Sequence, residues 1–163
     1  MATIMGGAPA WAQDLASRAQ AMEYIVATLP KATSANPKYL TKADGSLTQW
    51  LTDKVSFTKD GAGAAVVTMR EHFVQTKAGK TTQARHDARF ALPDVKIDPY
   101  QAPEDVTPKG ETAIGIAFTC KTPGCVAAIW GDATTHADSS DIYVQDVATR
   151  DRLLAAFQRL QSP

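Results

Sequence analysis

The chain has no long apolar run and no excess of charge of either sign. Its 163 residues include 17 Lys and Arg against 17 Asp and Glu. No stretch approaches the roughly 20 apolar residues that a spanning helix needs, so we expect no transmembrane segment. A neutral chain offers no basic field to phosphate backbones, which argues against a nucleic-acid partner. The hydrophobic share of 44% is typical of a folded domain.

The sequence also lacks the signatures by which several enzyme classes are recognised. It contains no G-x-G-x-x-G, no Walker loop, no H-E-x-x-H and no G-x-S-x-G. These absences favour a non-catalytic protein without a cofactor, although they leave other enzyme classes open.

Cysteine is scarce, and both copies lie in one short stretch, "FTCKTPGCVAAIW", residues 118–130. Two thiolates are too few for a zinc site, and a redox pair would more naturally be C-x-x-C at a helix start. A disulfide between Cys120 and Cys125 is therefore favoured over two buried thiols. If the two cysteines face each other in a hairpin, Ile116 lies opposite Ile129 and the Trp130 ring covers Gly115.

The first residues, "MATIMGGAPAWAQ", end in the small-x-small pattern that signal peptidase cuts after. Residues 1–12 are interpreted as the remnant of a signal peptide, with a disordered terminus as the alternative. Together with the disulfide, this remnant predicts a periplasmic or secreted protein of the bacterial cell envelope.

Hydrophobic periodicity predicts a helix from Gln13 to Leu29, which Pro30 ends, and a polar linker up to residue 49. From Trp50 onward the period changes to two. A helix over 147–160 follows the last strand. We expect strands near 52–58, 64–76, 81–92, 94–97, 112–120, 125–131 and 140–144.

The alternation of apolar and polar residues predicts the register of the hairpin formed by the strands near 64–76 and 81–92. With its turn at Ala78-Gly79, paired positions sum to 157, so that one face is mostly apolar and the other polar. An Arg70–Asp87 ion pair then lies on the polar face. Glu71 and His86 are placed opposite each other on the apolar face.

The order of elements from about residue 50 resembles that of pleckstrin-homology-like (PH-like) domains. "DKVSF" resembles the start of their first strand, "FALPDVKIDPY" a strand-to-corner step in bacterial members, and "RDRLLAAFQRLQ" their closing helix. The resemblance implies an α+β fold in which residues 50–163 form an antiparallel β-barrel of about seven strands, closed by a C-terminal amphipathic helix. Residues 13–49 form the N-terminal helix and linker.

Members of that family mostly bind proteins, peptides or lipids without catalysis. The resemblance therefore implies a binding module for a protein, peptide or lipid-like ligand, with contact residues that the sequence does not identify. The alternative is a small hydrolase or metal-dependent enzyme that uses Glu71 and His86 as an acid–base pair. A solvated loop is the simplest reading of residues 131–141, but four of its side chains are weak candidates for metal ligands: Asp132, His136, Asp138 and Asp141.

Overall fold

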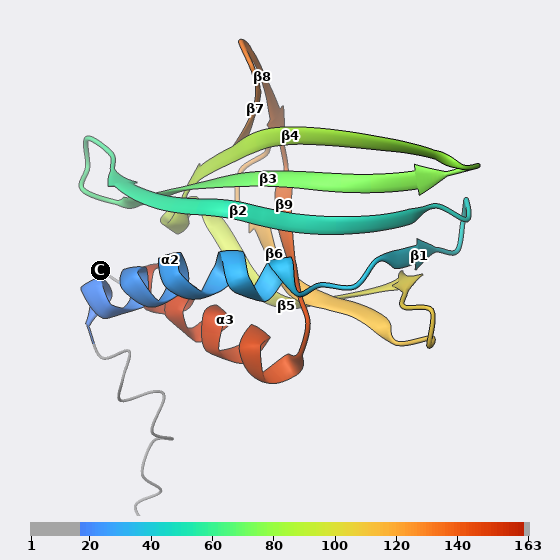
Figure 1. Ribbon diagram of the computed structural model, residues 1–163. Helices are drawn as coiled ribbons and strands as arrows, with labels where there is room; N and C mark the ends of the chain where they lie inside the picture. Colours follow the sequence, from blue (N-terminus) through green and yellow to red (C-terminus); the bar gives the residue numbers. More distant parts are fainter. Residues whose placement is uncertain (1–16, 162–163) are drawn as a thin grey trace, which may run out of the picture.

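The computed structural model describes residues 17–161, which form two helices packed against one large antiparallel sheet (Figure 1). The helices are α2 (Arg18–Ser34) and α3 (Val147–Gln161). A 3-10 turn, η1 (Leu92–Asp94), separates two of the strands. The strands are β1 (Tyr39–Thr41), β2 (Leu47–Lys59), β3 (Ala65–Lys77), β4 (Lys80–Ala91), β5 (Val95–Val106), β6 (Thr112–Cys120), β7 (Val126–Trp130), β8 (Ala133–Ala137) and β9 (Ser139–Val144).

The sheet is open, with the strand order β8-β7-β4-β3-β2-β1-β5-β6-β9. The expected α+β class is confirmed, but the closed barrel of about seven strands is wrong, because nine strands form a sheet whose edge strands β8 and β9 do not pair. We call β2, β3, β4, β7 and β8 the first wing and β5, β6 and β9 the second wing. The short strand β1 joins them. β2 to β4 lie on the side of α2 away from α3 (Figure 1), and α3 packs against α2 and the second wing.

The predicted register of the β3–β4 hairpin is confirmed at every pair. Val67 lies opposite Phe90 and Glu71 opposite His86. Ala78 and Gly79 form the turn with positive φ angles of 48° and 74°, as a two-residue hairpin of this twist requires. The polar face carries the expected Arg70–Asp87 ion pair, at 2.9 Å.

The disulfide between Cys120 and Cys125 is present, but the hairpin predicted around it is not. β6 pairs with β5 on one side and β9 on the other, so both of its edges are occupied. β7 therefore crosses to the first wing and pairs with β4 and β8. The disulfide closes the short loop at this crossing and does not join paired strands.

Helix α2 continues past Pro30 to Ser34, so the predicted helix end is wrong. The turn after Pro30 is held by β2: the backbone N–H of Thr52 donates to Thr33 Oγ1 at 2.8 Å, and Asn36 Nδ2 donates to the Trp50 carbonyl. These tertiary contacts outweigh the lost helical hydrogen bond at proline. Residues 13–16 of the predicted helix, and the proposed signal remnant 1–12, lie outside the described residues.

Two further expectations about strands are corrected. The predicted linker 31–49 contains the end of α2, the strand β1 and the start of β2. The predicted loop around residue 135 contains β8, an exposed strand of small and polar residues with little hydrophobic alternation. Both segments owe their conformation to pairing with neighbouring strands, which local periodicity does not report.

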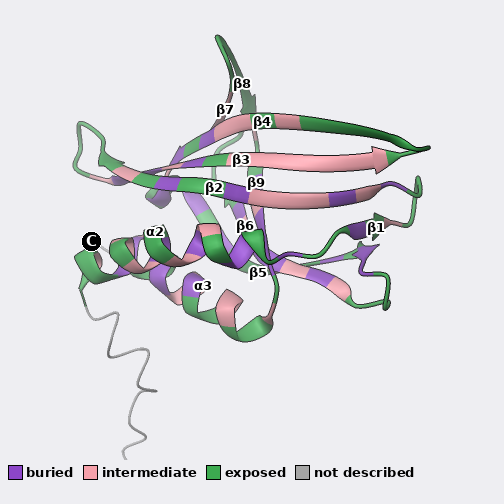
Figure 2. Cartoon of the chain, viewed as in Figure 1, coloured by how far each residue is buried: buried purple, intermediate pink, exposed green. Residues whose placement is uncertain are grey.

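The main core lies between the inner faces of the wings and the two helices. Phe118 of the second wing contacts Phe90 of the first wing and Phe157 of α3, with ring centroids 5.1 and 5.0 Å apart. Buried positions concentrate on the strand segments over the helices, whereas the far ends of β3 and β4 and the β7–β8 hairpin are largely half-buried or exposed (Figure 2).

Gly115 on β6 provides a test of the corrected topology. Trp130 does not cover it; instead the backbone of β9 passes so closely that a Cβ atom at position 115 would overlap the Ile142 carbonyl. We expect Gly115→Ala to lower the free energy of unfolding by about 1–3 kcal/mol, the usual cost of overpacking. Gly61→Ala is the control, because nothing lies within 4 Å of its added Cβ atom. Equal stability of the two variants in urea titrations would contradict the placement of β9 beside β6.

Candidate functional site

Glu71 and His86 form a pair on the inner face of the first wing. Glu71 Oε2 lies 3.2 Å from His86 Nε2, and the two side chains are 13% and 20% exposed. The Trp130 ring stacks on the imidazole with centroids 4.5 Å apart, although Trp130 itself remains 40% exposed. Trp130 thus covers one face of the His86 ring. It lies on β7, the strand that follows the crossing from β6 to the first wing.

A small cavity of about 50 Å³ lies beside the pair, between the two wings. Trp50 and Tyr143 contribute stacked rings 4.6 Å apart. We call it the inter-wing cavity. Its lining residues are Thr33, Trp50, Leu51, Thr52, Glu71, His72, Phe73, His86, Asp141, Ile142 and Tyr143.

Two carboxyl groups line this cavity in a poorly hydrated setting. Burial raises the pKa of Glu71, and the hydrogen bond and charge of His86 oppose that rise without cancelling it. Burial also raises the pKa of Asp141, whose charge acts in turn on Glu71. Within residues 17–161, Asp141 has no side-chain hydrogen bond or ion pair. The cavity therefore brings together two carboxyl groups that lack a strong cationic partner among the described residues.

The cavity is small for an enzyme substrate. Pockets for drug-sized ligands have volumes of about 300–1,000 Å³, whereas 50 Å³ accommodates a few water molecules or one small group. Within the described part of the chain, the hydroxyl groups that line it are those of Thr33, Thr52 and Tyr143, and Thr33 is engaged with the β2 backbone. This geometry favours a small-group site over a hydrolase centre.

The four candidate metal ligands of residues 131–141 go to different places. Asp132 lies exposed in the β7–β8 turn, while His136 and Asp138 fasten the cystine loop. His136 Nδ1 lies 3.0 Å from the Gly124 carbonyl, and the Gly124 N–H donates to Asp138 Oδ1 at 2.7 Å. Asp141 alone reaches the inter-wing cavity. Across the described part of the chain, no three His, Cys, Asp or Glu side chains are grouped to hold a metal ion.

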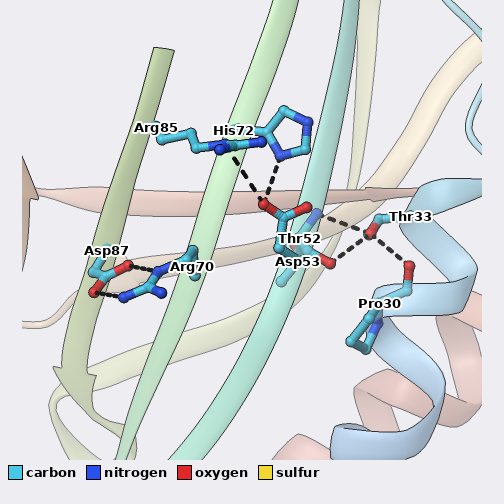
Figure 3. Close-up of polar contacts among 8 residues, drawn as sticks. All are labelled: Pro30, Thr33, Thr52, Asp53, Arg70, His72, Arg85 and Asp87. Carbon is cyan, nitrogen blue, oxygen red and sulfur yellow. Dashed lines mark hydrogen bonds and ion pairs between the residues drawn. The ribbon is translucent and has the colours of Figure 1, made fainter. Parts of the chain in front are cut away.

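The outer face of the first wing carries charges that pair with one another (Figure 3). Arg70 donates two hydrogen bonds to Asp87 and thereby lowers the pKa of that carboxyl group. The bulge between Thr52 and Lys54 brings Asp53 to this face, 2.8 Å from His72 Nδ1 and 3.9 Å from Arg85. Most of this face is thus a network of mutual partners.

One long strand edge in the first wing is unpaired. β7 pairs with β4 only at residues 87–89, and among the described residues no strand pairs with 80–86 on that side. Lys77 and Lys80 flank the two-residue turn and form a hydrogen-bonded pair, after which alternate residues point their backbone groups outward. Thr81, Gln83 and Arg85 therefore present free N–H and C=O groups. We call residues 80–86 the β4 edge.

Where β7 leaves β4, a surface hollow of about 380 Å³ adjoins the β4 edge. Side chains of both strands line it, including Arg85, His86 and Ile129. Trp130 follows Ile129 and is one of the few exposed large apolar side chains in the described chain. The edge thus ends beside a hollow that is large enough for a side chain.

Side chains cover parts of two other strand edges, those of β5 and β9. Along β5, Gln161 Nε2 donates to the Val95 carbonyl at 2.6 Å and Gln158 Nε2 to the Ile97 carbonyl at 3.3 Å. Pro99 and Pro103 also occupy β5 and discourage strand pairing. On β9, Asn36 Nδ2 donates to the Tyr143 carbonyl.

The chain matches no known protein family, no curated protein and no solved structure. The resemblance to PH-like domains therefore stays a prediction. Among residues 17–161, neither helix has the length and apolar character needed to cross a membrane. The sequence identified the Glu71–His86 pair through hairpin parity, but it missed the approach of Asp141 and Trp130, which depends on strand order.

Glu71→Gln tests the electrostatics of the pair. Because burial raises the pKa of Glu71, the stability that its protonated form contributes is present at low pH and lost as the pH rises through the folded pKa. Glutamine cannot ionise. We expect the substitution to raise the free energy of unfolding by about 1 kcal/mol at pH 7.5 and to have little effect at pH 4, measured by urea titration.

Asp87→Asn is the matched control, and it should change the free energy of unfolding at neutral pH in the opposite direction. Arg70 lowers the pKa of Asp87, so the stability from this carboxylate is present at neutral pH and lost as the pH falls through its folded pKa. This exposed pair contributes at most about 1 kcal/mol. A neutral-pH loss for both Asp87→Asn and Glu71→Gln would show that Glu71 is a stabilising ion-pair partner and contradict the account.

Proposed function

We propose that the protein is a non-catalytic binding module that recognises an extended peptide segment of a partner protein by strand addition to the β4 edge. The observation that carries the proposal is the run of unpaired backbone groups at Thr81, Gln83 and Arg85. On its other side β4 pairs with β3, which in turn pairs with β2, so the edge belongs to a three-stranded part of the sheet. An added strand would satisfy these groups and continue the sheet beyond the end of β7.

The β4 edge is favoured over the second open edge, that of β8. β8 is only five residues long and belongs to a two-stranded hairpin that projects from the body of the molecule (Figure 1). The β4 edge has seven residues and a wide sheet behind it. It also adjoins the hollow beside Ile129, which could receive one side chain of the incoming strand.

Charge around the edge indicates the chemistry of the peptide. From His72 to His86 the sequence contains Lys77, Lys80 and Arg85 but no Asp or Glu. Lys77 forms an ion pair with Asp44 at 3.1 Å. Lys80 has no ion pair among the described residues, and Arg85 lies 3.9 Å from Asp53. Positively charged edges resist pairing with other copies of themselves. They are complementary to an acidic peptide, which is the ligand that we propose.

The cystine bears on where such a partner would be met. Disulfides persist in oxidising compartments, and Cys120–Cys125 is the one cystine of the chain. We propose that the module acts outside the cytoplasm, in the bacterial cell envelope or as a secreted protein.

A random-peptide display library provides the test, with affinities of selected peptides measured by fluorescence polarisation. Gln83→Pro removes an outward N–H without touching the β3 ladder, and proline is tolerated on strand edges. We expect selected peptides to be acidic and Gln83→Pro to weaken their binding at least about tenfold. Gln83→Ala keeps the N–H group and should bind like the unmodified protein.

NMR spectra of isotope-labelled protein locate the bound peptide on the surface. Amide shifts on binding should be largest at residues 81, 83 and 85. The proposal fails if selected peptides perturb another surface, or if Gln83→Pro binds them as tightly as Gln83→Ala does. In either case backbone pairing at the β4 edge is not the mode of recognition.

A further inference from the structure

We infer that the inter-wing cavity is a binding site for a primary ammonium group, held by the carboxylates of Glu71 and Asp141 beside the rings of Trp50 and Tyr143. The site shares His86 with the end of the β4 edge but does not depend on strand addition. Its ligand is a small amine or the ammonium end of a longer molecule.

The first reason is an excess of hydrogen-bond acceptors over donors. The Asp141 carboxylate has no donor among the described residues, and the Glu71 carboxylate has only His86. His86 Nδ1 is buried and has no hydrogen-bond partner in the described structure. The tautomer in which Nε2 donates to Glu71 leaves Nδ1 as an acceptor. A ligand that fits must therefore supply several donors.

The second reason is charge. Glu71 and Asp141 line the same cavity, and the charge of Asp141 adds to the burial that raises the pKa of Glu71. No Lys or Arg side chain of residues 17–161 lines the cavity. The nearest strand positions with arginine, Arg70 and Arg85, point to the outer face, where Asp87 and Asp53 engage them. A pair of half-buried carboxylates is compensated best by a bound cation.

The third reason is the size and lining of the cavity. About 50 Å³ admits an ammonium with a short alkyl stem and excludes large organic cations. Trp50 and Tyr143 form one stacked wall, and Trp50 is only half-buried. Aromatic faces attract ammonium groups and accept the attached methylene groups. A primary ammonium combines three donors, one positive charge and this small size.

Methylammonium is the probe for this site, with potassium and tetramethylammonium as comparisons, all as chloride salts at constant ionic strength. Amide and indole shifts of the intact chain follow each titration. We expect saturable shifts with methylammonium at Glu71, Asp141 and the Trp50 indole. Potassium carries charge without N–H donors, and tetramethylammonium is also larger than the cavity. Both should give at most small, unsaturated shifts.

Two variants and one control connect the response to the carboxylates. Asp141→Asn and Glu71→Gln should each weaken methylammonium binding at least about tenfold. Both substitutions are neutral and close in shape to the original residue, so the fold should tolerate them. Asp132→Asn, at the exposed β7–β8 turn, should bind like the unmodified protein.

Three results would overturn the inference. Methylammonium could shift nothing, in which case the cavity holds only water. Potassium could give the same saturable shifts, which would make it a general site for monovalent cations. Asp141→Asn and Glu71→Gln could keep full affinity while folded, which would place the amine elsewhere. Each result is obtained without a peptide ligand, so it is independent of the test of strand addition.

Discussion

The occupation of both edges of β6 determines the rest of the molecule. Because β5 and β9 take those edges, the chain that leaves Cys120 cannot turn back beside β6 and has to cross to the first wing. There β7 finds only the end of β4, at residues 87–89. The disulfide between Cys120 and Cys125 and the hydrogen bond from the Gly124 N–H to Asp138 hold the crossing loop in its conformation.

Both proposed sites are consequences of this crossing. β7 is too short to cover β4, so seven residues of that strand keep an open edge. The same strand places Trp130 on His86. On the other side of β6, β9 carries Asp141 and Tyr143 into the space between the wings, where they meet Glu71 and Trp50. The β4 edge and the inter-wing cavity therefore arise from one topological constraint, and His86 belongs to both.

Local patterns predicted those parts of the structure that local contacts determine. The β3–β4 register follows from parity, since a slip of one residue would expose Val67 and Met69 and bury Arg70. The cystine follows from the short spacing of the only two cysteines. The closing helix follows from its apolar periodicity, and Phe157 and Leu160 of the predicted stripe are buried, whereas Val147 is exposed. In each case the partners are near in sequence or lie on one element.

The failures share a physical origin as well. The parity of β7 is compatible with any antiparallel neighbour, so it could not distinguish β6 from β4 as its partner. Helix α2 passes Pro30 because of hydrogen bonds to a strand that begins later in the chain. In the sequence, Asp141 cannot be distinguished from the other acidic residues of its segment. Its approach to Glu71 follows only from the pairing of β9 with β6. The candidate site thus depended on contacts between distant segments, for which a single sequence carries little signal.

Hydrogen exchange of the backbone amides along β4 tests the central claim, which is that this strand has a free edge. The register predicts alternation in the isolated protein: slow exchange at residues 82, 84 and 86, whose amides face β3, and fast exchange at 81, 83 and 85. The outward-facing amides of residues 87 and 89 should also exchange slowly, because β7 pairs with β4 there. Uniform protection from 81 to 86 would mean that something covers the edge, and it would contradict the account.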